Sequence, residues 1–179
     1  VKHTKAYLEE KSKTDRKLIG QFFTPYETAK YMAQLFSIPT QKVIRILDPG
    51  AGSGVLAAAL IERILKVKGV EKLELICYEN NSSIIPLLES NLSYIKENTK
   101  IPLDYKIIEE NYITSQGEDF NGLIGAKQRF ANYFDCIIGN PPYKKIPKDA
   151  PEATSMPLVC HGAPNLYFLF AAMSVYNLN

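Results

Sequence analysis

The residues best suited to chemistry in this sequence are Asn140, Pro141, Pro142 and Tyr143, which end the apolar run "FDCIIG". They combine a hydrogen-bonding amide, two rigid prolines and an aromatic ring. A proline turn that stops a strand is the simpler alternative. With proline at about 5% of residues, however, this combination arises by chance in roughly one chain in a hundred of this size. The pattern therefore favours a functional site.

A glycine-rich loop, "DPGAGSG", follows an earlier apolar run. Its glycines allow a tight turn and a close approach of backbone to ligand. Val55 stands where the last glycine of a GxGxxG motif belongs, and no GK[ST] follows, so neither common nucleotide motif fits. Asp48, which begins the loop, would repel a pyrophosphate but would accept a hydrogen bond from an amine or a ribose hydroxyl. A tight turn between a strand and a helix is the alternative for the glycines.

Polar residues also end two further apolar runs. Glu79 suits paired hydrogen bonds to the two hydroxyls of a ribose, and Asn111 and Tyr112 close the next run. Open α/β sheets bind ligands outside the carboxyl ends of their strands. All four runs therefore place polar groups where one ligand could meet them.

The elements that would position these residues alternate along the chain. Four short runs rich in Ile, Leu or Tyr predict strands, and apolar residues at helical spacing lie between them. This order predicts an α/β, doubly wound and mainly parallel sheet wrapped by helices. The predicted strands are residues 42–48, 73–79, 105–110 and 133–139.

The predicted helices carry recognisable ends. Thr24 with Glu27 forms a capping box ahead of residues 25–36, and Ser82 or Ser83 would cap residues 84–95. Asn165 would cap a final helix that is apolar on nearly every face and therefore predicted to be buried. Between them, residues 141–164 hold six prolines, and a loop of that length is usually functional or mobile.

Length and composition set the class. The 179 residues suit one domain, and 46% hydrophobic with 22% charged residues suits a globular protein. No apolar run is long enough to cross a bilayer and residues 1–17 show no secretory signal, so we expect a cytoplasmic protein. Cys77 and Cys136 lie in apolar runs and should be reduced core residues. A net charge of +2 does not diagnose nucleic-acid binding, although residues 1–19 are basic.

Taken together, these motifs resemble the S-adenosylmethionine-dependent amino-methyltransferases, and more closely the N6-adenine DNA methyltransferases of restriction–modification systems. The resemblance extends from Gly20 to about Leu178. It implies a class I, Rossmann-like fold, S-adenosylmethionine as cofactor, no metal, a prokaryotic cell and double-stranded DNA with a flipped adenine. "GQFFTP" ahead of the glycine loop and "NPPY" is the gamma arrangement, in which target recognition lies towards the C-terminus.

The resemblance also assigns residues to the cofactor. Thr24 of "GQFFTP" would contact its methionine end, and "YEN" places Glu79 at the ribose with Asn80 beside the adenine ring. The family usually has Asp and an aromatic residue at the third strand, where this chain has Asn111 and Tyr112. The amide of Asn111 can still contact the adenine but also offers a donor. The cofactor residues implied are Thr24, Asp48, Pro49, Gly50, Gly52, Glu79, Asn80, Asn111 and Tyr112.

"NPPY" is similar to the catalytic motif of the family, and "PNLYFLF" to the motif in the following helix. By this resemblance, the Asn140 oxygen and the Pro141 carbonyl would accept the two N–H bonds of an adenine amino group and stabilise its developing charge. Pro141 and Pro142 would hold that carbonyl in place. Tyr143 would stack on the flipped base, which offsets about a few kcal/mol of unstacking.

Three functions remain open at this point: methylation of adenine in DNA, methylation of a protein glutamine amide or an RNA amino group, and cofactor binding without catalysis. "GQFFTP" and "DPGAGSG" favour DNA. We expect residues 20–179 to be a partial catalytic domain, because about three more strands and a recognition domain should follow. The fourth strand would then be an uncovered edge through which copies of the chain could associate.

Overall fold

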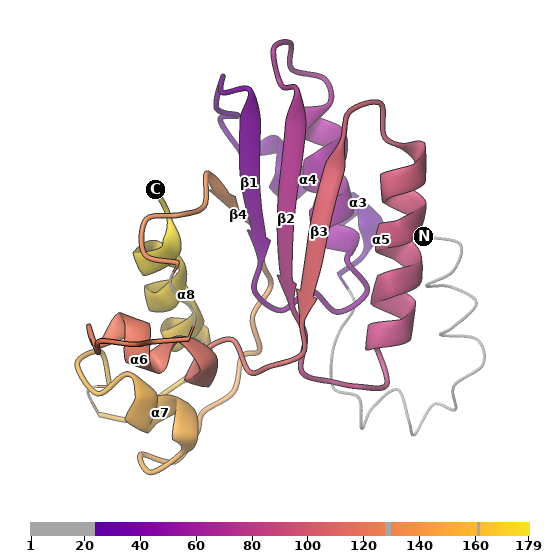
Figure 1. Ribbon diagram of the computed structural model, residues 1–179. Coiled ribbons are helices and arrows are strands. Elements are labelled where there is room, and N and C mark those ends of the chain that lie inside the picture. Colours follow the sequence, from indigo (N-terminus) through magenta and orange to yellow (C-terminus); the bar gives the residue numbers. More distant parts are fainter. Residues whose placement is uncertain (1–23, 128–129, 161) are drawn as a thin grey trace.

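The computed structural model describes residues 24–127, 130–160 and 162–179, and the basic segment 1–19 lies outside these ranges. A four-stranded parallel sheet in the order β3-β2-β1-β4 forms its centre (Figure 1). The α/β prediction is confirmed, with strand ends shifted by a few residues. The strands are β1 (Val43–Asp48), β2 (Lys72–Tyr78), β3 (Leu103–Ile108) and β4 (Cys136–Ile137).

One face of the sheet is covered by α3 (Tyr26–Gln34), α4 (Val55–Ile64) and α5 (Ile85–Asn98). Ile46 of β1 and Leu75 of β2 lie in this core and are almost fully buried. Both strands are followed by a helix on this same face, as right-handed crossovers between parallel strands require.

The other face is covered by α8 (Leu166–Asn177). Leu47, the neighbour of Ile46 on β1, points into this second core together with Met173 of α8, as expected from the alternation of side chains along a strand. Helices on both faces confirm the doubly wound arrangement. Cys77 and Cys136 are free and buried, as predicted.

Three short helices lie beyond the carboxyl ends of the strands (Figure 1). They are η1 (Thr114–Gln116), α6 (Gly117–Phe120) and α7 (Pro151–Ser155). The last belongs to the proline-rich segment, which is closed at its base by an antiparallel bridge between Lys145 and Asn165. The segment is therefore a folded cover with its own helix.

Two predicted helix caps are wrong. The N-cap of α3 is Pro25 and no side chain caps it, so Thr24 and Glu27 form no capping box. Ahead of α5, the Asn81 side chain accepts hydrogen bonds from the backbone and hydroxyl of Ser83, which makes an Asx turn instead of a serine cap. At α8 the prediction is confirmed, because the Asn165 side chain accepts from the Tyr167 backbone at 3.0 Å.

The prediction that α8 is buried all round is wrong. Leu169 and Met173 face the sheet, whereas Phe168 and Val175 are 67% and 74% exposed. An apolar composition allows other elements to pack against every face of a helix. Which faces are in fact packed depends on the tertiary structure. None of the helices in the described ranges is long and apolar enough to span a membrane.

The edge at β4 is only partly open. Phe134, just before β4, forms a parallel bridge with Leu178, and the Asn179 backbone donates to the Phe134 carbonyl at 2.9 Å. Residues after α8 thus begin to pair beside the start of the fourth strand. This corrects the expectation of an uncovered edge at that end, while β4 itself pairs only with β1 in the described part of the chain.

Candidate active site at the carboxyl edge of the sheet

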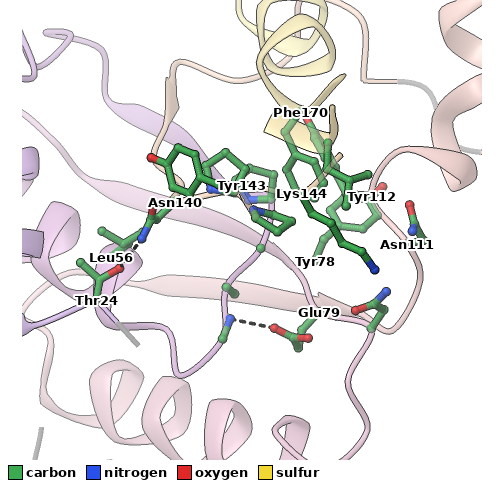
Figure 2. Close-up of a pocket in the computed structure, with 18 of the residues that line it drawn as sticks. Thr24, Leu56, Tyr78, Glu79, Asn111, Tyr112, Asn140, Tyr143, Lys144 and Phe170 are labelled. Atoms are coloured by element: carbon green, nitrogen blue, oxygen red, sulfur yellow. Dashed lines mark hydrogen bonds between the residues drawn. The ribbon is translucent and has the colours of Figure 1, made fainter. Parts of the chain in front are cut away.

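A cavity of about 650 Å³ lies at the carboxyl edge of the sheet. Its walls come from the segments that follow all four strands, together with Thr24 and part of α8 (Figure 2). Every residue predicted for catalysis or cofactor binding lines it, with the exception of Asp48. Those residues are Thr24, Pro49, Gly50, Gly52, Glu79, Asn80, Asn111, Tyr112, Asn140, Pro141, Pro142 and Tyr143.

The glycine loop forms the floor of the cavity. Gly52 has a φ of 53°, in the left-handed region that favours glycine. The Ala51 backbone donates to the Tyr78 carbonyl at 2.9 Å, which ties the loop to the end of β2. The loop therefore presents backbone rather than side chains, and a ligand could approach it closely.

Glu79 is held in place by the backbone. One carboxylate oxygen accepts from the Gly52 N–H at 2.9 Å and the other from the Asn81 N–H at 2.8 Å, while only 4% of the residue is exposed (Figure 2). Each oxygen keeps further acceptor capacity. This geometry suits a vicinal diol, so the residues present fit the ribose of an adenosyl cofactor.

Asp48 does not reach the cavity. It lies beneath the glycine loop with no exposed surface, and its carboxylate accepts from the Ala57 N–H of α4 at 3.3 Å. Burial raises its pKa to about 7, against the opposing effect of the Ala57 and Gly50 amides. Asp48 therefore joins the end of β1 to the start of α4 and does not line the cavity, and its expected contact with the cofactor stays a prediction.

Asn140 is placed by two contacts from distant parts of the chain. Its side-chain Nδ2 donates to the Thr24 hydroxyl at 3.2 Å (Figure 2). A Cβ at Gly139 would lie 3.0 Å from Pro49 Cγ, so the motif packs directly against the glycine loop. Within the part of the chain that the structure describes, no group donates to the Asn140 side-chain oxygen. That oxygen is available as an acceptor.

Tyr143 stands at the mouth of the cavity and is 76% exposed. Its ring is stacked on that of Tyr167, with centroids 5.2 Å apart and planes 16° apart. Tyr167 is part of "PNLYFLF" in α8. A planar substrate could therefore stack on Tyr143 while Tyr167 supports the ring.

Tyr112 and Asn111 form the far wall, after β3. The Tyr112 ring packs against Tyr78 and Phe170, each with centroids 5.1 Å apart, and burial raises the pKa of its hydroxyl. That hydroxyl donates to Asn177 at 2.8 Å. Tyr112 is therefore a fixed apolar surface of the cavity.

The Asn111 side chain is engaged at both ends. Its oxygen accepts from the Ile113 and Thr114 backbones at 2.9 and 3.2 Å, and its Nδ2 donates to a Glu152 carboxylate oxygen at 2.9 Å. The acceptor that the resemblance implied at this position is thus already used by the backbone.

Several lining residues escaped the sequence analysis. Phe170 was included only as the last residue of "PNLYFLF", with no role assigned to it. Glu152 lies in the proline-rich segment, where no periodic pattern indicates which side chains face a ligand. One signal in the sequence indicated a further carboxylate in the cavity: Asn111 stands where the family usually has an aspartate. The lining residues beyond those predicted for the site are Ala51, Ser53, Val55, Leu56, Tyr78, Glu110, Lys144, Glu152, Leu166 and Phe170.

The fold is that of a class I methyltransferase. It superposes with a TM-score of 0.58 on a crystal structure described as a class I S-adenosylmethionine-dependent methyltransferase from Listeria monocytogenes, at 12% identity. The match covers 90% of this chain and 46% of that one. At this identity the likeness is one of fold.

The sequence places the chain within a family. The model of the N-6 DNA Methylase family matches residues 5–162, and the chain belongs to that family. It is 33% identical over 161 residues to the type II methyltransferase M.BsuBI of Bacillus subtilis, covering 88% of this chain and 31% of that protein. The type II methyltransferase M.PstI of Providencia stuartii is 30% identical over 168 residues, covering 92% and 32%. The chain thus spans about a third of the length of these relatives.

Proposed function

We propose that this protein transfers a methyl group from S-adenosylmethionine to the N6 amino group of adenine in DNA, as the modification component of a restriction–modification system. The observation that carries the proposal is the Asn140 amide, whose oxygen is free at the cavity edge while its nitrogen is bound to Thr24. Membership of the N-6 DNA Methylase family and the relatives named type II methyltransferase support it.

The cofactor would lie along the edge of the sheet and supplies a methyl group activated on a sulfonium. Glu79 would accept hydrogen bonds from the ribose hydroxyls, and the backbone at Gly50 and Gly52 would line the path towards Asn140. Thr24 and Asn80 line the same cavity, where Thr24 would border the methionine end and Asn80 the base. Asp48 supports the loop from below.

The substrate amino group would be positioned by the Asn140 oxygen and the Pro141 carbonyl. Two acceptors aimed at its two N–H bonds turn the nitrogen lone pair towards the donor and stabilise the positive charge that develops. Pro141 and Pro142 restrict the backbone around the carbonyl. Tyr143, backed by Tyr167, receives the base once it has left the DNA helix.

The proposed partner is double-stranded DNA. Lys144, Lys145 and Lys148 follow the motif and could contact phosphates, which would make binding depend on salt. Residues 20–179 would form part of the catalytic domain, with target recognition supplied elsewhere in a longer protein. The bacterial sources of the relatives support a cytoplasmic, prokaryotic setting, and association of copies through the open part of β4 is part of the same proposal.

The test is methyl transfer by the full-length protein from labelled S-adenosylmethionine. Double-stranded DNA, RNA and protein are offered separately, and the DNA is digested to nucleosides. We expect label in N6-methyladenine, and none with Asn140→Ala. Label on RNA or on protein glutamine, with none on DNA, would replace the proposal by the alternative substrate. Cofactor binding without transfer to any of the three would support a binding module instead.

A further inference from the structure

We infer that Glu152, on α7 of the proline-rich cover, is the acceptor for the exocyclic amino group of the cofactor's adenine, in place of an acid at position 111. The inference rests on the proposed cofactor site and deepens it by naming the residue that selects the base. It begins from Asn111, whose side chain donates to Glu152 at 2.9 Å.

Asn111 cannot serve as the acceptor. Its oxygen already accepts from the backbones of Ile113 and Thr114, and its nitrogen is a donor, like the adenine amino group itself. A second donor facing that amino group would repel it. The cavity therefore needs another acceptor near the end of β3.

Among the residues that the structure describes, three acids line the cavity: Glu79, Glu110 and Glu152. Glu79 is bound by two backbone amides in the position for the ribose. Glu110 is paired with Lys127 at 3.1 Å. Among the described residues, Glu152 receives a hydrogen bond only from Asn111, and so it keeps acceptor capacity.

The order of the segments along the sheet edge indicates where the base of the cofactor would lie. The strand order β3-β2-β1-β4 places Asn111, Glu79, the glycine loop and Asn140 in that sequence. Figure 2 shows Asn140 and Asn111 at opposite ends of the group, with Glu79 between them. A cofactor with its reactive end at Asn140 and its ribose at Glu79 carries its base to the Asn111 end, where Glu152 lies.

The α7 helix holds Glu152 firmly. Ala153 of α7 and Met156 at its C-terminal end are buried, and the Asn121 side chain donates to the Ser155 carbonyl at 2.9 Å. A Cβ at Gly117 would lie 2.9 Å from Ser155 Cβ, so the helix sits directly on the start of α6. The carboxylate is thus carried by a docked element, as a selective contact requires.

The residue types at 111 and 152 are then linked. An aspartate at 111 would face the Glu152 carboxylate at hydrogen-bond distance with no proton between them. An asparagine makes the pair attractive and orients the carboxylate. In this proposal Glu152 of α7 takes the role of the acid that the family usually carries after the third strand, and the Asn111 amide orients its carboxylate by a hydrogen bond.

The test measures binding of S-adenosylhomocysteine and of S-inosylhomocysteine, which has a carbonyl where adenine has its amino group, to the full-length protein by calorimetry. We expect the wild type to prefer the adenosyl compound by about 10- to 100-fold, as for a hydrogen bond to a charged group. In Glu152→Gln the side-chain oxygen accepts from Asn111 and leaves its NH₂ towards the base, so the preference should disappear or reverse. Glu109→Gln, an exposed acid outside the cavity, should keep it.

A second pair of variants separates binding from folding. Asn111→Asp should weaken binding of the adenosyl compound about tenfold or more, because two carboxylates then face each other. Adding Glu152→Gln exchanges donor and acceptor, and should restore both affinity and the preference for the adenosyl compound. Thermal unfolding of each variant checks that the fold is kept.

The outcomes are distinct. A Glu152→Gln protein with the wild-type preference, or a double variant no better than Asn111→Asp, would overturn the role of Glu152 while leaving the cofactor site standing. Absence of S-adenosylhomocysteine binding in the wild type and in Glu109→Gln would overturn the proposed cofactor site, and this inference with it.

Discussion

The two halves of the cavity hold their polar groups in different ways. In the cofactor half, made by the glycine loop and Glu79, the functional carboxylate is 4% exposed and is fixed by two backbone amides. In the proposed substrate half, made by Asn140–Tyr143, the Asn140 amide has one hydrogen bond among the described residues, to Thr24, and Tyr143 is 76% exposed. The polar groups of the proposed cofactor half are therefore fixed by the fold, whereas those of the proposed substrate half keep open hydrogen-bonding capacity.

The largest effect should come from the substrate half. Asn140→Ala removes an acceptor aimed at charge that develops only during transfer, so we expect methyl transfer to fall about 10²- to 10³-fold. Affinity for S-adenosylhomocysteine should fall much less, since the Asn140 side chain is joined to the proposed cofactor residues through the Thr24 hydroxyl, while Glu79 is held by backbone amides. Single-turnover transfer and calorimetry measure the two quantities. Asn98→Ala, on the surface of α5, is the matched control, and equal losses of both quantities would contradict the division into halves.

The next effect belongs to the support of the cofactor half. Burial raises the pKa of Asp48 from 3.8 to about 7. The folded state therefore binds this proton more tightly than the unfolded state, and the resulting stability is fully present below about pH 4 and is lost as the pH rises through 7. The change is of the order of a few kcal/mol.

Urea unfolding of the wild type and of Asp48→Asn between pH 4 and 8 measures this dependence. The free energy of unfolding of the wild type should fall relative to that of Asp48→Asn as the pH rises. The contributions of the other titrating groups are common to both proteins and cancel in this difference. Curves that stay parallel over the whole range would show that the Asp48 carboxyl does not titrate there.

A smaller effect is expected at Glu79 itself. Glu79→Gln keeps the shape but removes the charge from the proposed hydrogen bonds to the ribose, so affinity for S-adenosylhomocysteine should fall about 10- to 100-fold. Transfer at saturating cofactor should fall much less. Glu71→Gln, which breaks an exposed ion pair with Lys42, should have little effect on either. A lowered saturated rate with full affinity would assign Glu79 to the substrate half instead.

The smallest effect should be at Tyr167, which backs the ring of Tyr143. A stacked aromatic pair contributes about 0.5–1.5 kcal/mol, so Tyr167→Ala should lower transfer to DNA about 2- to 10-fold. Tyr167→Phe keeps the stacked ring and should retain activity. Equal losses in both variants would indicate that the hydroxyl, and not the stack, is what matters.

Much of the fold could be predicted because its signals are local. Each strand is a short apolar run, and the helices between the strands repeat apolar residues at helical spacing. The site followed from the same reasoning, since the carboxyl ends of parallel strands share one edge. The direction of the Asp48 side chain could not be predicted, because a residue at the end of a strand can point into the core as readily as towards a ligand, and packing against α4 decides between the two.

Long-range contacts could not be predicted. Thr24 was expected to cap α3, but its hydroxyl meets Asn140 instead, more than a hundred residues further along the chain. Glu152 was overlooked because its position depends on how α7 packs. Ser155 of α7 lies against Gly117, and Ala153 of α7 is buried. The exposure of Phe168 and Val175 likewise depends on which neighbours α8 has.

The sequence by itself determined the order of strands and helices, the glycine loop and the "NPPY" motif, because these follow from backbone preferences and from residues a few positions apart. Only the tertiary structure decided which side chains face the cavity. It turned Asp48 inward, paired Asn140 with Thr24 and joined Asn111 to Glu152. Such pairs depend on the relative placement of separate elements, which is fixed by the packing of the whole core on both faces of the sheet.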